Sequence, residues 1–219
     1  MDILIACESS QTVCKAFREK GHNSYSCDII PCYGDMPEYH IQGDCLRLLN
    51  GRVEFVTQDG KLHEEIIDKP WDMIIAHPPC TYLSKAGACK TFDFYGKIKN
   101  SQRIQYGNEA REFFMKFFSA DVDKLCIENP VPLKYFKLPM WSQIIEPYYF
   151  GDPYSKKTCL WLKGLPELYP TNIISENIES WTSKHSSKKI RSKTFEGIAK
   201  AMSEQWYEGV LPYQLSITF

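Results

Sequence analysis

The sequence has no Cys-x-x-Cys pair among its nine cysteines, no internal repeat and no low-complexity segment. Because the spacing of Cys27, Cys32 and Cys45 does not fit a zinc finger or ribbon, we expect no metal site. No apolar run reaches the roughly 18 residues that a membrane-spanning helix needs, and the N-terminus lacks the basic and apolar regions of a signal peptide. We therefore expect a cytoplasmic protein with reduced thiols and no membrane partner.

Net charge is also nearly absent. The chain carries 26 Lys and Arg against 27 Asp and Glu, a formal charge of -1. A uniformly basic nucleic-acid-binding protein is thereby excluded, and any basic groove must be local. With 219 residues, of which 43% are hydrophobic, the chain is long enough to bury a sizeable core. We expect a single domain over residues 1–219.

Short apolar runs alternate with helical patterns along the chain. We expect helices over 11–20, over 101–119 and within 191–206, and strands at 2–7, 23–28, 41–45, 72–76, 124–127 and 158–162. This alternation predicts an α/β fold with a doubly wound, mostly parallel sheet. Asp59-Gly60 predicts the turn of a hairpin insertion over 52–66. The polar interval 164–193 predicts a loop-rich excursion.

The most informative segment is His77-Pro78-Pro79-Cys80, which follows an apolar strand. Neither proline can donate to a β-ladder, so the strand must end there. Cys80 then begins a loop at the carboxyl edge of the sheet, where ligands bind in open α/β folds. A thiol at this edge is a candidate nucleophile. Taken alone, it is better explained as a structural cysteine.

The first turn between strand and helix has no Gly-x-Gly-x-x-Gly pattern. Its Glu8 would repel a pyrophosphate but suits a cationic amino-acid group, which favours S-adenosylmethionine over NAD. Ser9 or Ser10 is expected to cap the helix that follows. Asp28, at the end of the second strand, is placed to accept hydrogen bonds from ribose hydroxyls, and Asp44 could lie beside the adenine. Each carboxylate alone also fits a solvated turn.

Four segments, taken together, resemble the C5-cytosine DNA methyltransferases, above all the short versions found in phage and prophage genomes. Pro79-Cys80-x-x-x-Ser84-x-Ala86-Gly87 resembles the nucleophile loop of that family. Ile127-Glu128-Asn129-Pro130 resembles its Glu-Asn-Val motif. The segment 149–158 resembles its Tyr-Gly-x-Pro-Gln-x-Arg motif, and 191–199 the entry to its final helix. These segments follow one another in the family's order.

The resemblance implies a class I S-adenosylmethionine methyltransferase (Rossmann-like) fold and a reaction. Cys80 would attack C6 of a cytosine, C5 would take the methyl group, and a base would then remove the C5 proton. Glu128 would hold or protonate N3, which requires a raised pKa. Lys156 falls where the family keeps an Arg that helps to hold the base. S-adenosyl-L-methionine would contact Ala6, Cys7, Glu8, Ser9, Ser10, Gln11, Asp28, Ile29, Asp44, Cys45, His77, Pro78 and Thr194.

The sequence departs from the family in its motifs and in its length. The Phe-x-Gly-x-Gly cofactor turn is replaced by residues 6–10, Thr81 stands where Gln is usual, Tyr154 replaces the Gln of the later motif, and Thr158 replaces one of its basic residues. A full target-recognition domain does not fit into the interval 164–193. Recognition would use that minimal excursion, the active-site loop 81–107, or a protein partner.

Two basic segments are candidates for contact with DNA phosphates. The loop 81–107 interleaves basic and aromatic residues, a composition that suits phosphate contact and base stacking; it fits a lid over the site equally well. The run 183–193 is basic and contains no acid; it also fits a solvated loop. The residues proposed to bind DNA are Ser84, Lys85, Lys90, Arg103, Lys184, Lys188, Lys189 and Arg191.

Three other functions remain open at this point. His77-Pro78-Pro79-Cys80 could be a variant of the Asp/Asn-Pro-Pro-Tyr/Phe motif of amino-methyltransferases, although His77 and Cys80 supply neither the acceptor nor the aromatic ring of that chemistry. A methyltransferase-like protein that has lost catalysis could bind nucleic acid or a nucleotide. The same covalent chemistry could act on a free pyrimidine nucleotide.

Overall fold

The computed structural model describes residues 1–49, 55–60, 62–63, 71–184 and 187–207. Its centre is a seven-stranded sheet in the order β3-β2-β1-β6-β7-β10-β8. The sheet comprises β1 (Asp2–Ala6), β2 (Asn23–Asp28), β3 (His40–Gln42), β6 (Met73–Ala76), β7 (Lys124–Pro130), β8 (Gln143–Ile145) and β10 (Thr158–Lys163). Neighbouring strands from β3 to β7 are parallel, and β10 is antiparallel to both of its neighbours.

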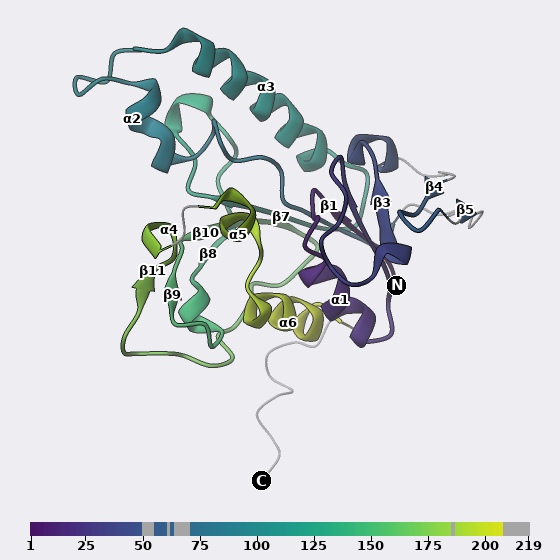
Figure 1. Ribbon diagram of the computed structural model, residues 1–219. Coiled ribbons are helices and arrows are strands. Elements are labelled where there is room, and N and C mark those ends of the chain that lie inside the picture. The colour runs from purple at the N-terminus through teal and green to yellow at the C-terminus, as the bar shows by residue number, and fades with distance from the viewer. Residues whose placement is uncertain (50–54, 61, 64–70, 185–186, 208–219) are drawn as a thin grey trace.

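Helices cover the sheet on both faces (Figure 1). The helices α1 (Thr12–Glu19) and α6 (Glu196–Gln205) lie side by side on one face, and the long helix α3 (Ser101–Phe118) lies on the other. Smaller elements complete the chain: α2 (Ala88–Thr91), α4 (Trp181–Lys184), α5 (Lys188–Ser192), β4 (Phe55–Val56), β5 (Leu62–His63), β9 (Tyr154–Ser155) and β11 (Glu179–Ser180).

Alternation within the strands builds one apolar core on each face. Ile3 and Ile5 of β1 point toward α1 and α6, where they join a buried cluster with Phe17 and Met202. The intervening Leu4 belongs to the opposite cluster, with Phe114 and Phe117 of α3 and Trp161 of β10. A strand buried on both faces reads as a continuous apolar run, as β1 and β6 do. The predicted fold class, a doubly wound and mostly parallel α/β sheet, is confirmed.

The direction in which successive strands are added to the sheet changes at β1. The strands β2 and β3 follow on one side of it, and β6 and β7 on the other. The carboxyl ends of β1 and β6 therefore flank a switch point, which is the place where open α/β sheets bind ligands. The fold brings to this edge the residues that follow β1, β2 and β6, together with the last residues of β7.

Most predicted elements appear close to their expected bounds, with four differences. The predicted strand 124–127 extends to Pro130, so Glu128 and Asn129 lie within β7 and not after it. The interval 191–206 contains the end of α5 and then α6, separated at 193–195. The strands β8, β9 and β11 and the short helices α2 and α4 were not predicted. The predicted hairpin is present as β4 paired with β5, while its residues 52–54, 61 and 64–66 lie outside the described residues.

The described chain contains no helix that is long and apolar enough to cross a bilayer. Within the same residues, no three His, Cys, Asp or Glu side chains are grouped so that they could hold a metal ion.

Gly107 lets α3 approach the rest of the protein closely. A Cβ at this buried position would lie 2.0 Å from Cζ of Phe136, which is itself buried. We expect Gly107→Ala to lower the free energy of unfolding by about 1–3 kcal/mol, because the overpacking outweighs the gain in helix propensity. Urea unfolding measures the change. Asn108→Ala, at the exposed neighbouring position, is the control and should change stability by less than about 0.5 kcal/mol.

Adding Phe136→Leu to Gly107→Ala should recover part of that loss, because it removes the ring that the methyl group meets. Equal stability of Gly107→Ala and the wild type would contradict this account of the α3 contact.

Candidate active site

Cys80 lies in a tight loop that β6 and β7 hold together. Asn129 Nδ2 donates to the carbonyl of Pro78 at 2.7 Å, which ties the two prolines to β7. The N–H groups of Leu83 and Ser84 donate to the carbonyl of Cys80 at 3.1 and 3.0 Å, so the chain turns back directly after the thiol. The backbone around Cys80 is therefore fixed on both sides.

The thiol of Cys80 is only partly exposed. Burial raises its pKa, and the negative charge of Glu128 raises it further. The positive charges of Lys156 and Arg191 act in the opposite direction without cancelling the rise. In this state the Cys80 thiol keeps its proton at neutral pH. To act as a nucleophile, the thiol must first lose that proton.

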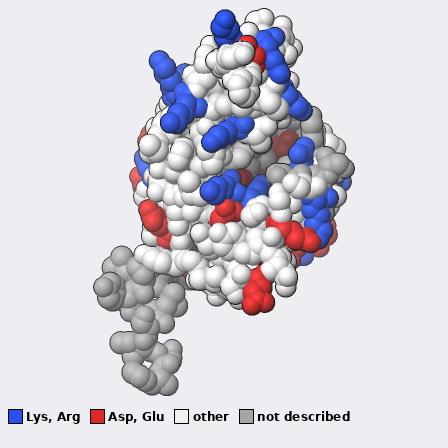
Figure 2. Space-filling model, turned by 90° about the vertical axis from the view of Figure 1, so that its left-hand side faces the viewer, with Lys and Arg blue, Asp and Glu red and all other residues white. Residues whose placement is uncertain are grey.

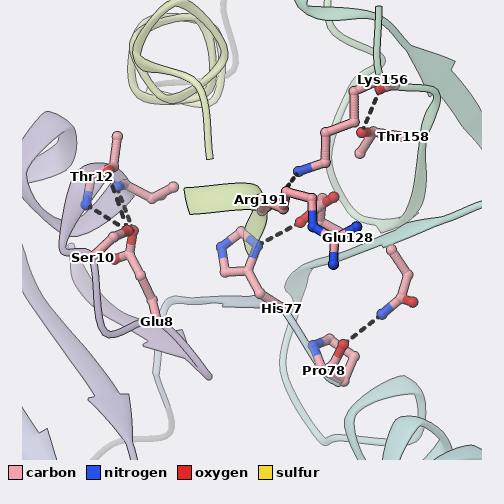
Figure 3. A network of polar contacts seen from close by, with 11 residues as sticks. Glu8, Ser10, Thr12, His77, Pro78, Glu128, Lys156, Thr158 and Arg191 are labelled. Atoms are coloured by element: carbon pink, nitrogen blue, oxygen red, sulfur yellow. Dashed lines mark hydrogen bonds and ion pairs between the residues drawn. The ribbon is translucent and has the colours of Figure 1, made fainter. Parts of the chain in front are cut away.

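Glu128 and His77 form a pair at the ends of neighbouring strands (Figure 3). His77 Nδ1 lies 3.0 Å from Glu128 Oε2, and the side chains are 9% and 13% exposed. Burial raises the pKa of Glu128, but the hydrogen bond from His77 and the charges of Lys156 and His77 outweigh burial, so the pKa lies below its ordinary value. The expectation of a raised pKa for Glu128 is therefore wrong for this state, because the sequence did not reveal that His77 would contact it.

Lys156 reaches the same site from the segment between β9 and β10. Its Nζ donates to the carbonyl of Arg191 at 3.0 Å, and its backbone N–H donates to Glu146 Oε2 at 2.7 Å. Its charge lowers the pKa of both Cys80 and Glu128. The structure thus brings Cys80, Glu128 and Lys156, the three predicted catalytic residues, to one place.

A cavity of about 370 Å³ adjoins this site at the carboxyl ends of β1, β2 and β6. The predicted cofactor residues that line it are Cys7, Glu8, Ser9, Ser10, Asp28, Ile29, Asp44, Cys45, His77 and Thr194. The other three predicted residues, Ala6, Gln11 and Pro78, do not line it. Ala6 and Pro78 are buried in the sheet edge, and the amide of Gln11 bonds to the backbone N–H and C=O of Met36 at 3.1 and 2.7 Å.

Sequence reasoning missed five residues of the cavity wall: Ile30, Tyr33, Pro79, Phe113 and Ser192. Three of them adjoin residues that were predicted, and only the loop conformation decides which neighbour faces inward. Phe113 comes from α3, and the helical pattern over 101–119 did not mark it as a residue of the cavity. Tyr33 follows Asp28 in a loop without periodicity, so no signal in the sequence placed it.

The turn between β1 and α1 contains no glycine, and two of its residues have strained backbone conformations. Cys7 and Gln11 adopt left-handed backbone conformations, at φ 59° and 60°, which cost a residue with a side chain roughly 1–2 kcal/mol each. The N–H of Cys7 donates to Cys45 Sγ at 3.3 Å, and the side-chain bonds of Gln11 to Met36 hold the other residue. Contacts of Cys45 and Gln11 thus hold two left-handed residues in a turn that contains no glycine.

Glu8, and not Ser9 or Ser10, accepts hydrogen bonds from the backbone N–H groups at the beginning of α1. Its carboxylate accepts hydrogen bonds from the N–H groups of Val13 and Cys14 at 2.7 and 3.1 Å. Ser10 Oγ accepts only a long bond from Thr12 N at 3.4 Å. The predicted serine cap is therefore wrong. Burial raises the pKa of Glu8 in spite of these bonds, and Glu8 also lines the cavity.

The residues predicted to bind DNA fall into three groups. Lys85 and Lys90 are exposed, whereas Ser84 is buried. Arg103 serves the fold, since it donates to Thr91 Oγ1 and to the carbonyl of Thr81, each at 3.1 Å. The third group is the basic run: Lys184 pairs with Glu179, Lys189 lies over the ring of Tyr33, Arg191 points toward the catalytic site, and the side chain of Lys188 lies outside the described residues.

No model of a known protein family matches the chain, and no curated protein matches it. Two solved structures are similar in fold. A prophage-encoded protein from E. coli, described as a DNA modification methyltransferase, has a TM-score of 0.42 and 15% identity, and the match covers 78% of this chain and 51% of the other. A triple mutant of DNMT2 from Spodoptera frugiperda has a TM-score of 0.33 and 15% identity, with coverages of 81% and 54%. The chain thus spans about half the length of either protein.

Proposed function

We propose that this protein is a C5-cytosine DNA methyltransferase that uses S-adenosylmethionine and forms a covalent adduct through Cys80. The observation that supports this most strongly is the arrangement at the ends of β6 and β7. A fixed thiol, a carboxylate paired with His77 and the charge of Lys156 meet there, beside a cavity large enough for a small cofactor. Pocket volumes of roughly 300–1,000 Å³ are usual for such ligands.

The residues of the cavity fit S-adenosylmethionine, which supplies the methyl group when it is bound. Asp28 presents a carboxylate that would accept hydrogen bonds from ribose hydroxyls, and Asp44 would lie beside the adenine, for which Ile29 and Phe113 offer apolar walls. His77 Nε2 is buried and has no hydrogen-bond partner among the described residues. Such an atom is costly to leave unpaired, which supports a polar ligand group beside it.

The three catalytic side chains have distinct tasks. The Cys80 thiolate would form a bond to C6 of the cytosine, which makes C5 nucleophilic. Glu128 would give a proton to N3, so that negative charge does not build up on the ring. Lys156 favours the thiolate and is placed to hold the base. After C5 has taken the methyl group and S-adenosylhomocysteine has been released, a base removes the C5 proton, the C6–S bond breaks, N3 gives its proton back to Glu128 and the thiolate returns. In a duplex, the cytosine must first leave the stack.

The test uses labelled S-adenosylmethionine and cytosine-containing DNA, followed by digestion to nucleosides. 5-Methylcytosine as the labelled product establishes the proposal. Labelled N4-methylcytosine or N6-methyladenine would replace it with an amino-methyltransferase. Label on a free pyrimidine nucleotide, with none on DNA, would assign the smaller substrate. Cofactor and DNA binding without transfer to any acceptor would identify a protein that only binds.

A further inference from the structure

Two aromatic side chains project from the loop between α2 and α3. Phe94 is 97% exposed and Tyr95 is 83% exposed. The two rings contact each other edge to face, with centroids 5.6 Å apart. Neither ring is packed into a core. Large apolar groups exposed in this way mark a contact surface.

The backbone holds this tip without using the two rings. Phe92 and Ile98 form a β-bridge, and the N–H of Asp93 donates to the carbonyl of Lys97 at 2.9 Å. The carboxylate of Asp93 accepts from the N–H groups of Tyr95 and Lys97 at 2.9 and 2.8 Å. Gly96 takes the left-handed conformation, at φ 78°, that the turn requires. We call residues 92–98 the aromatic turn. Its shape does not depend on the aromatic side chains, so their exposure needs another explanation.

The surroundings of the aromatic turn are basic. Residues 82–106 contain five Lys or Arg, and Asp93 is the single acid. Lys85, Lys90, Lys97 and Lys99 are exposed, and no acid in the described chain pairs with any of them. In the view of Figure 2, Lys and Arg side chains (blue) predominate over the upper part of the surface. Exposed rings among unpaired cations complement a ligand that combines flat apolar faces with negative charge.

We propose that the aromatic turn is a stacking platform for unpaired bases of a nucleic acid, with the flanking lysines in contact with its phosphates. The inference rests on the proposed DNA substrate and adds to it a preference for unpaired strands. Bases in a duplex hide their faces against their neighbours, whereas an unpaired base offers a face to an aromatic ring. A protein partner would not need the excess of cations, and phosphate contacts alone would not need the rings.

The test measures the affinity of the intact protein for one labelled oligonucleotide, as a single strand and as a duplex, by fluorescence anisotropy. Phe94→Ala/Tyr95→Ala should weaken single-strand binding by roughly 10- to 100-fold and duplex binding by less than about threefold. Lys97→Gln/Lys99→Gln should weaken both and reduce the salt dependence of each. Met140→Ala removes another exposed apolar side chain, 79% exposed, and should change neither affinity.

Unchanged single-strand affinity in the double aromatic variant would overturn the proposal, and so would an equal loss for duplex. A melting temperature equal to that of the wild type shows that the variant is folded. Because binding is measured without methyl transfer, the inference can fail while 5-methylcytosine is still formed. Conversely, ring-dependent single-strand binding without methylation would uphold the platform and reject the proposed reaction.

Discussion

Cys80→Ala should abolish methyl transfer, with a loss of roughly 10³-fold or more, because no other group can form the bond to C6. The clearest measurement traps the covalent adduct. Incubated with S-adenosylmethionine and DNA that contains 5-fluorocytosine, the wild type should form a complex that survives denaturation, since fluorine at C5 cannot leave as a proton does. The Cys80→Ala variant should form none.

Cys89 provides the matched control for this experiment. It lies in α2, nine residues after Cys80, and its thiol is exposed. Cys89→Ala should trap DNA as the wild type does, which separates the catalytic thiol from general thiol reactivity. Both variants should bind S-adenosylmethionine alike, because neither side chain lines the cavity. If the Cys80→Ala variant still methylated DNA, the covalent mechanism would be refuted.

The sequence predicted the framework of the fold, because that framework depends on local patterns. The apolar runs that became β1 and β6 are buried on both faces, and prolines and glycines mark the ends of several elements. The strand β8 has only three residues, and β9 only two. Segments so short carry no periodicity of their own, and pairing with β10 or β11 defines them.

The candidate site was predictable to the extent that it follows strand ends. Asp28, His77 and Glu128 lie at or near the carboxyl ends of parallel strands, so topology alone brings them to the same edge of the sheet. What the sequence could not provide is conformation. The bond between His77 and Glu128 depends on ring orientation. Likewise, the positive φ of Cys7 and Gln11 contradicts local preference and is held by partners distant in sequence.

Glu128→Gln should lower kcat/KM for methylation by roughly 10²- to 10⁴-fold, the usual contribution of a general acid. An amide can bond to N3 but cannot give it a proton. The pH dependence is a sharper test, because the two groups start in unfavourable protonation states. The pKa of Glu128 lies below its ordinary value of 4.5, and the pKa of Cys80 lies above its ordinary value of 9.0. At neutral pH the proton is therefore on sulfur, whereas the reaction needs it on the carboxyl.

Moving that proton from Cys80 to Glu128 leaves the total number of bound protons unchanged. We therefore expect kcat/KM to be flat across neutral pH, to fall below the lowered pKa of Glu128, and to fall above the raised pKa of Cys80. His77 fixes the position of the acid limb. In His77→Ala the hydrogen bond and the charge that lower the pKa of Glu128 are lost while burial remains, so the pKa rises.

The acid limb should then move to higher pH in His77→Ala while the alkaline limb stays in place. His77→Asn is the matched variant, because its amide can still donate to Glu128 but carries no charge, and it should shift the acid limb less. A merely structural role for His77 would lower the rate at every pH and leave both limbs in place. An acid limb at the same pH in the wild type and His77→Ala would refute the assignment of this limb to Glu128. In the proposed reaction His77, whose ring contacts the carboxyl of Glu128, therefore also influences the pH at which that carboxyl can act.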